Sequence, residues 1–136
     1  MMAKKALVVD DSPTIRNLVS FCMEREGFEV TTAIDGLHAL DEAALQSFDV
    51  IITDVNMPQM DGIAFIRELR TRQEGKHIPV LVLTVLNSAE KKAEAKAAGA
   101  TAWLEKPFEP EVLVKAVKLV ISSERAKLQD KLEDMA

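Results

Sequence analysis

The chain has 136 residues, of which 48% are hydrophobic and 29% charged, and its formal net charge is −5. This length and composition are typical of one globular domain with a core of its own. The acidic balance argues against nucleic acid and anionic membranes as partners, and no apolar run approaches the ~20 residues that a membrane-spanning helix needs. One cysteine excludes an internal disulfide and fits a reducing compartment, so we expect a cytoplasmic protein.

Short apolar runs alternate with helical patterns from one end of the chain to the other. The expected strands are residues 6–9, 28–32, 48–54, 79–84 and 100–105. Helix starts follow each of them, at Ser12-Pro13, Asp35-Gly36, Gly62, Asn87 (with Glu90 as a capping box) and Pro110. Five such cycles predict an α/β fold with a parallel sheet, and right-handed crossovers favour a doubly wound (βα)5 arrangement with helices on both faces.

Two of the expected helices differ in how well apolar residues anchor them. The second should turn an apolar face inward, formed by Leu37, Leu40, Ala44 and Leu45. The fourth, which ends at Gly99, consists almost entirely of Ala, Lys and Glu, and like charges stand four residues apart on it. We therefore expect the fourth helix to be the most loosely held.

Carboxylates stand where two of the expected strands end. Asp10 and Asp11 follow the first strand, and Asp54 ends the third. In a flavodoxin-like sheet of order 2-1-3-4-5, an order taken over from known folds of this class, those two strands are neighbours at the topological switch point. Three carboxylates in one crevice must protonate or bind a cation, and oxygen ligands without His or Cys suit Mg²⁺ or its relative Mn²⁺. The crevice is therefore predicted to handle phosphate groups.

Two further polar side chains end the remaining strands of this edge. Thr84 ends the fourth strand and Lys106 follows the fifth, just before Pro107. A hydroxyl and an ammonium beside a metal-bound carboxylate are suitable contacts for the oxygens of a phosphoryl group. Each residue alone is a weak signal, but the combination is specific.

The combined set resembles the receiver domain of two-component response regulators, and most closely the stand-alone, chemotaxis-type regulators. It consists of Asp10-Asp11, Asp54, the turn Met57-Pro58 with Asp61-Gly62, Thr84, and Lys106-Pro107. The resemblance covers residues 4–122 as the phosphoacceptor domain. It leaves residues 123–136, which we expect to form a solvated C-terminal helical extension rather than a dimer seam, with no output domain.

The resemblance implies a role for each matching residue. Asp54 would accept a phosphoryl group from a histidine kinase, with Asp11 as a direct Mg²⁺ ligand and Asp10 acting through water. Asn56 would offer its backbone carbonyl to the ion. Thr84 and Lys106 would hold the phosphoryl oxygens, the Lys106–Pro107 bond would be cis, and Trp103 would be the switch aromatic.

Two positions depart from the pattern of that family. Val85 stands where the family prefers a small residue, so we expect it to narrow access to Asp54. Trp103 is bulkier than the usual Tyr or Phe, so an inward rotamer needs more room. Because few residues follow the part covered by the resemblance, we expect output through protein contacts, to a motor, kinase or phosphorelay partner. The expected surface is the face formed by the fourth helix, fifth strand and fifth helix, because the fourth helix is the most loosely held and Trp103 lies between.

Two other functional classes remain open at this point. An aspartyl-phosphate phosphatase could use the same nucleophile, but Asn56 stands where such enzymes place a second acid, so fast turnover is not expected and the protein is predicted not to be an enzyme. A receiver-like interaction module that is never phosphorylated is the second alternative. The intact acidic set argues against it, whereas Val85 and Trp103 are compatible with it.

Overall fold

The computed structural model describes residues 3–85 and 88–135, with side chains as far as Ser122. The strands are β1 (Lys5–Val9), β2 (Glu29–Ala33), β3 (Val50–Asp54), β4 (Val80–Thr84) and β5 (Ala102–Glu105). The helices are α1 (Pro13–Arg25), α2 (Gly36–Leu45), α3 (Gly62–Thr71), the short 3₁₀ helix η1 (Gln73–Gly75), α4 (Ala89–Ala98) and α5 (Pro110–Met135). All strand pairs are parallel and the order is β2-β1-β3-β4-β5, so the predicted doubly wound fold is confirmed.

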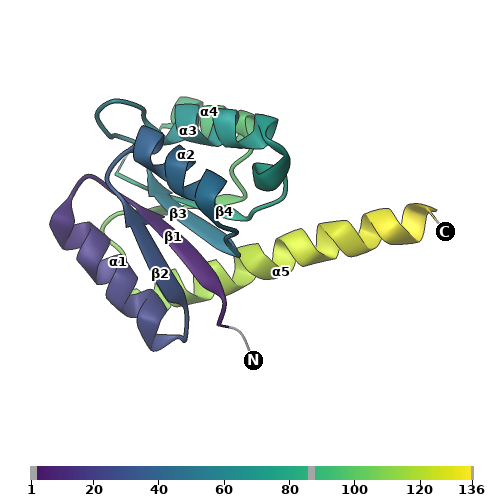
Figure 1. Ribbon diagram of the computed structural model, residues 1–136, viewed down its shortest axis with the longest axis horizontal. Coiled ribbons are helices and arrows are strands. Elements are labelled where there is room, and N and C mark those ends of the chain that lie inside the picture. Colours follow the sequence, from purple (N-terminus) through teal and green to yellow (C-terminus); the bar gives the residue numbers. More distant parts are fainter. Residues whose placement is uncertain (1–2, 86–87, 136) are drawn as a thin grey trace.

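The helices form two layers, one on each face of the sheet. Helices α1 and α5 cover one face, and α2, α3 and α4 cover the other (Figure 1). Successive residues of β1 alternate between the two cores: Ala6 and Val8 pack with α1 and α5, whereas Leu7 and Val9 pack with the opposite layer. Every residue of β3 is buried, which explains its run of β-branched residues, because a central parallel strand is covered on both sides.

Side-chain caps determine where the helices begin. The side chains of Ser12, Asp35 and Asp61 accept hydrogen bonds from the backbone N–H groups of the first turns of α1, α2 and α3. The cap of α4 is Ser88, whose hydroxyl accepts from the Lys91 N–H at 3.1 Å. The predicted cap Asn87 lies outside the described residues.

The predicted inner face of α2 is wrong except at Leu40. Its buried residues are Gly36, Ala39, Leu40 and Ala43, whereas Leu45 is 78% exposed and Leu37 is also exposed. Helix α2 presents small residues to the sheet and its neighbours, so it packs closely. A prediction from hydrophobicity alone places the larger side chains Leu37 and Leu45 on the buried face, whereas the structure buries Ala39 and Ala43 there.

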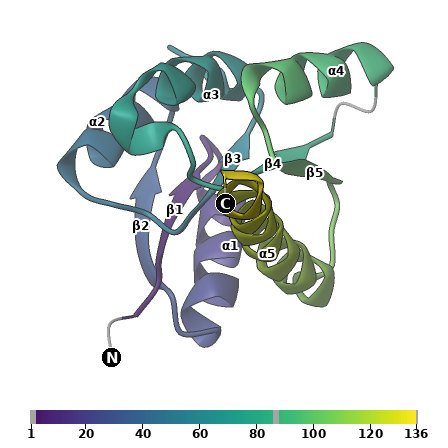
Figure 2. The same ribbon diagram turned by 90° about the vertical axis from the view of Figure 1, so that its right-hand side faces the viewer.

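Helices α4 and α5 differ sharply in how the fold holds them. Of its described residues α4 buries only Ala95 and Ala98, in agreement with the expectation that it is weakly anchored. Helix α5 packs through Leu113, Val117 and Val120, and its backbone then continues as a helix beyond the sheet (Figures 1 and 2). Within the described part of the chain, no helix combines the length and the hydropathy that crossing a bilayer requires.

Candidate functional site

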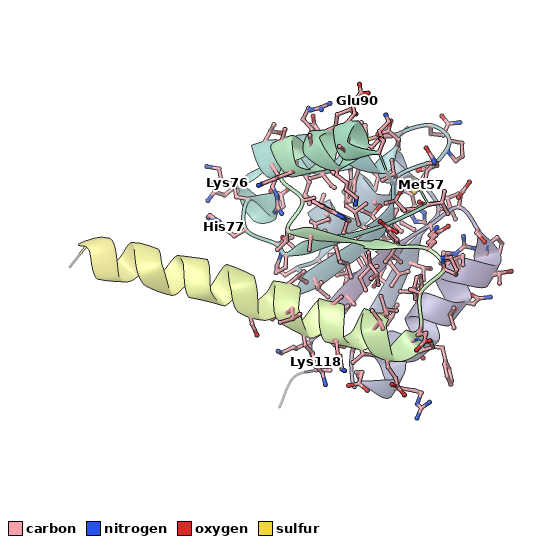
Figure 3. The ribbon with its side chains drawn as sticks, turned by 180° about the vertical axis from the view of Figure 1, so that it is seen from behind. Met57, Lys76, His77, Glu90 and Lys118 are labelled. Carbon is pink, nitrogen blue, oxygen red and sulfur yellow. The ribbon has the colours of Figure 1, made fainter. Side chains whose placement is uncertain are left out.

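Three carboxylates converge at the carboxyl ends of the neighbouring strands β1 and β3. Each of Asp10, Asp11 and Asp54 offers an oxygen, and these oxygens lie within 4.8 Å of one another. Asp10 is 2% exposed and Asp54 is 9% exposed, whereas Asp11 lies open to solvent. Figure 3 labels Met57, which follows Asp54 in the loop after β3 and so marks this end of the sheet. It lies away from the projecting part of α5. The structure therefore brings together all three acids that the strand ends predicted.

The ammonium group of Lys106 lies between the two buried acids. Its Nζ is 3.2 Å from Asp10 Oδ2 and 3.3 Å from Asp54 Oδ2, and the lysine side chain is 13% exposed. Lys106 comes from the end of β5, two strands away from β3 in the sheet. One cation thus offsets part of the repulsion between two carboxylates in a poorly solvated pocket.

Backbone groups hold both buried acids in place. The Ser12 N–H donates to Asp10 Oδ1 at 2.9 Å, and the Val55 N–H donates to Asp54 Oδ1 at 2.7 Å. The Arg16 guanidinium donates to the carbonyl oxygen of Asp10 at 2.8 Å. Sequence reasoning missed Arg16, whose only signal is its place in the first turns of a helix that starts beside the acids.

The surroundings of Asp54 raise the pKa of its carboxyl group and so make its ionised form less favourable than it is in water. Burial raises the pKa of its carboxyl group above the ordinary value of 3.8, the charge of Lys106 lowers it, and the charge of Asp10 raises it again. The net effect is upward because desolvation is the largest of these causes. A second cation in the pocket would offset the desolvation cost of the Asp54 carboxylate and its repulsion by Asp10.

The donor set fits a hard divalent cation. All three side chains offer carboxylate oxygens, and two of them are held by backbone N–H groups, so part of the site is preorganised. Mg²⁺ is commonly bound by one or two carboxylates together with water and phosphate oxygens. Asp11 is exposed, so one carboxylate of the set is in contact with solvent.

The other predicted residues lie on β4, on β5 and in the segments that follow β3, β4 and β5. Thr84 ends β4 and is 5% exposed, and its carbonyl oxygen accepts from the Lys106 N–H at 2.9 Å. Val85 is 65% exposed, next to Thr84, and Asn56 lies exposed in the loop after Asp54. Trp103 is 37% exposed on the edge strand β5, and the Lys106–Pro107 peptide bond is cis.

A glycine closes the turn behind Asp54. The Gly62 N–H donates to the carbonyl oxygen of Val55 at 2.8 Å, which draws the start of α3 against the end of β3. A Cβ atom placed on Gly62 would overlap the carbonyl oxygen of Asp54. The sequence indicated a turn at Asp61-Gly62 but gave no sign of this close approach.

Replacing Lys106 with methionine should destabilise the protein when no divalent cation is present. The change leaves Asp10 and Asp54 without the cation that lies between them. We expect Lys106→Met to lower the free energy of unfolding by roughly 2–4 kcal/mol in chelator, because a buried charge loses its partner. Added Mg²⁺ should stabilise this variant more than the wild type, and urea unfolding with and without Mg²⁺ measures both effects.

Lys118→Met is the matched control for that experiment. Lys118 also pairs with a carboxylate, because its Nζ lies 3.2 Å from Glu26 Oε1. Its side chain is 66% exposed, however, and it lies on α5, away from the acidic pocket (Figure 3). An exposed pair contributes little, so its loss should change stability by less than about 1 kcal/mol. Equal losses in the two variants would show that Lys106 does not neutralise a buried acidic pair.

Comparisons with protein families, curated proteins and solved structures all find response regulators. Residues 6–118 match the model of the response regulator receiver domain family. The chemotaxis protein CheY-3 of Vibrio cholerae is 41% identical over 105 residues, which cover 76% of this chain and 81% of that protein. The crystal structure of the chemotaxis response regulator CheY4 of Vibrio cholerae superposes with a TM-score of 0.84 at 50% identity, covering 88% of this chain and 99% of that one.

Other relatives are longer proteins. The alkaline phosphatase synthesis regulator PhoP of Bacillus subtilis is 38% identical over 120 residues, which cover 88% of this chain but 49% of PhoP. This chain thus spans about half the length of the curated relatives that it matches first.

Two further solved structures bear on the chemistry of the acidic crevice. The receiver domain of the sensor histidine kinase PA1611 from Pseudomonas aeruginosa, 27% identical with a TM-score of 0.82, has a magnesium ion coordinated in its active-site cleft. It aligns over 89% of this chain and 99% of that one. The DrrB receiver domain, 33% identical with a TM-score of 0.78 and the same coverage, was solved in a form activated by beryllium fluoride.

Proposed function

This chain belongs to the response regulator receiver domain family, and from that premise we propose that it is a signalling module switched by phosphorylation of Asp54. Its phosphoryl donor is a histidine kinase, the general donor of the family. The observation that carries the proposal is the placement of a buried carboxylate next to two other carboxylates and one ammonium group. This is the arrangement that charged phosphoryl oxygens and a divalent cation require together.

In the proposed reaction, a carboxylate oxygen of Asp54 attacks the phosphorus atom of a phosphohistidine. As the new phosphorus–oxygen bond forms, the phosphorus–nitrogen bond breaks and its electron pair returns to the imidazole ring. The ring leaves as a neutral histidine, because its other nitrogen keeps the proton. Lys106, with Nζ 3.3 Å from Asp54 Oδ2, is placed to pair with one oxygen of the transferred group, and the Thr84 hydroxyl is the second proposed contact.

Asp10, Asp11, Asp54 and the carbonyl group of Asn56 are the proposed ligands of a Mg²⁺ ion, with Mn²⁺ as a substitute. When bound, the ion supplies the positive charge that allows carboxylates and phosphoryl oxygens to share one pocket. The convergence of the oxygens of Asp10, Asp11 and Asp54 within 4.8 Å of one another supports this assignment. Val85, exposed beside Thr84, is proposed to limit how fast small molecules reach Asp54.

The signal is proposed to leave the protein on the face formed by α4, β5 and α5. Phosphorylation would draw Thr84 toward the new group and allow Trp103 and α4 to repack. The weak anchoring of α4 supports this direction, as does a hollow of about 590 Å³ lined by residues of β5, the loop after it and the start of α5, among them Trp103, Phe108 and Val112. The partner is a downstream protein, and the CheY-type relatives favour a chemotaxis output.

The phosphoaspartate is proposed to be a signal and not an intermediate of turnover. Asn56 follows Asp54 by two residues, and its amide cannot act as the general acid that a phosphatase would place there. Hydrolysis would then depend on water reaching a pocket whose acceptor is 9% exposed.

Acetyl phosphate provides the direct test of this function. The wild-type protein, incubated with acetyl phosphate and Mg²⁺, should gain the mass of one phosphoryl group on the peptide that contains Asp54. The adduct should not form in chelator. Continuous release of free phosphate at enzymatic rates would favour the phosphatase, and the absence of any adduct with Mg²⁺ or Mn²⁺ would favour the interaction module.

A further inference from the structure

One lysine of α4 contacts two residues of β5. The Lys92 Nζ lies 5.5 Å from the centre of the Trp103 ring and 3.4 Å from Glu105 Oε1. The lysine side chain is 28% exposed, so part of its stem is covered. A cation over an indole face and a cation beside a carboxylate are both favourable contacts, and here one ammonium group makes them together.

The alternation of β5 explains why these contacts coincide. Ala102 and Leu104 pack into the core shared with α5, so Trp103 and Glu105 point to the opposite face, which α4 covers. Helix α4 places no large apolar side chain there, because its described buried residues are Ala95 and Ala98. Lys92 is therefore a specific contact between α4 and the predicted switch aromatic.

The same two residues of β5 adjoin the acidic pocket. Glu105 pairs with Thr84 in the β4–β5 ladder and immediately precedes Lys106. Trp103 lies two residues further back and pairs with Val82. Thr84, the ladder partner of Glu105, and Lys106, its chain neighbour, therefore lie next to a residue that Lys92 of α4 contacts.

We infer that Lys92 is a positioning residue that holds Trp103 in its half-exposed position and thereby favours the resting form of the switch. The inference rests on the proposed function, because it concerns the same Thr84–Trp103 rearrangement. For Trp103 to turn inward, its ring must leave the ammonium group, so the contact opposes activation. Loss of that contact should make activation easier without touching the acidic pocket.

The test uses Trp103 as its own reporter, since it is the single tryptophan of the chain. Beryllium fluoride with Mg²⁺ is titrated into ¹⁵N-labelled protein, and the one indole N–H resonance is followed. In Lys92→Met, we expect the half-saturating concentration of beryllium fluoride to fall about three- to fivefold. This is the size of effect expected from the loss of two weak surface contacts, one with Trp103 and one with Glu105. The resonance of the free variant should also move toward the position of the saturated wild type.

Two matched variants make the result specific. Lys91→Met removes the neighbouring charge, which pairs with Glu94 inside α4 at 3.4 Å, and should leave the titration unchanged. Lys92→Arg keeps the cation and should retain wild-type behaviour. An unchanged half-saturation in Lys92→Met, or an equal change in Lys91→Met, would overturn the inference alone. A wild-type resonance that does not respond to beryllium fluoride and Mg²⁺ would contradict the proposed Thr84–Trp103 rearrangement and the inference with it, whereas only the absence of the acetyl phosphate adduct would contradict phosphorylation of Asp54.

Discussion

The variant Asp54→Asn is expected to lose phosphorylation completely and to be more stable than the wild type when no metal is present. An amide oxygen is a poor nucleophile toward phosphorus, so neither acetyl phosphate nor a phosphorylated kinase should add a phosphoryl group. The same change removes a charge that burial and Asp10 make unfavourable. We expect the free energy of unfolding at neutral pH to rise by on the order of 1 kcal/mol.

The pH dependence of stability follows from the direction of that shift. The pKa of Asp54 is higher in the folded protein than its ordinary value of 3.8, so the folded state binds this proton more tightly than the unfolded state. Stability contributed by this group is therefore highest below 3.8 and is lost as pH rises through the folded pKa. Urea unfolding in chelator at a series of pH values tests this, because the stability of the wild type relative to Asp54→Asn should decline as pH rises.

Asp41→Asn is a suitable control, because Asp41 lies exposed on α2, outside the acidic pocket. It removes the same charge by the same substitution and should leave adduct formation unchanged. A phosphoryl adduct that persists in Asp54→Asn would assign the acceptor to another residue. A variant less stable than the wild type would show that Asp54 gains more from Lys106 than it loses by burial.

Gly62→Ala is expected to be the most damaging single methyl addition near the site. The new Cβ would overlap the carbonyl oxygen of Asp54, which belongs to the backbone of a central strand and cannot move alone. We expect the free energy of unfolding to fall by about 2–4 kcal/mol. Phosphorylation by acetyl phosphate should also slow, because any relief of the overlap displaces the end of β3.

Gly27→Ala separates this steric effect from the general cost of replacing a glycine. Gly27 has a positive φ of 91°, but a Cβ there would meet nothing within 4 Å. Only the backbone conformation opposes the change, at a cost of roughly 1–2 kcal/mol, and phosphorylation should be unaffected. If the two variants lost equal stability and both kept normal phosphorylation, the contact between Gly62 and Asp54 would have no role in the site.

The sequence was sufficient to predict the parallel sheet and the acids at its strand ends, whereas the strand order, and with it the convergence of the three acids, was taken over from known folds of this class. Carboxylates at the ends of strands can be located from the pattern alone, because parallel strands of one sheet end at the same edge. The pairing of Lys106 with both Asp10 and Asp54 could not be predicted from the sequence, because it depends on the rotamer of a long side chain. Its place after β5 suggested only that it would lie nearby.

Packing details were harder to predict than topology. The exposed Leu45 and buried Ala39 and Ala43 show that the inner face of α2 follows the space above the sheet and not the size of the side chains. Lys92 appeared in the sequence as one of several charges on a polar helix, and nothing marked it as the residue that contacts Trp103. Such contacts depend on how a helix is placed over its strand.

The way in which α4 is attached has a mechanical consequence. At its C-terminal end, Gly99 adopts a left-handed conformation and its carbonyl oxygen accepts from Arg70 Nε at 3.1 Å and Nη2 at 2.8 Å, next to the buried Ala98. At the other end, Ser88 and Ala89 are exposed. The helix is therefore held more firmly at its Gly99 end than at its Ser88 end. With ten residues it is about 15 Å long, so a tilt of about 10° moves its far end by about 3 Å. The displacement grows along the helix from Gly99, so it is already large at Lys92, where α4 contacts Trp103, and largest at the Ser88 end.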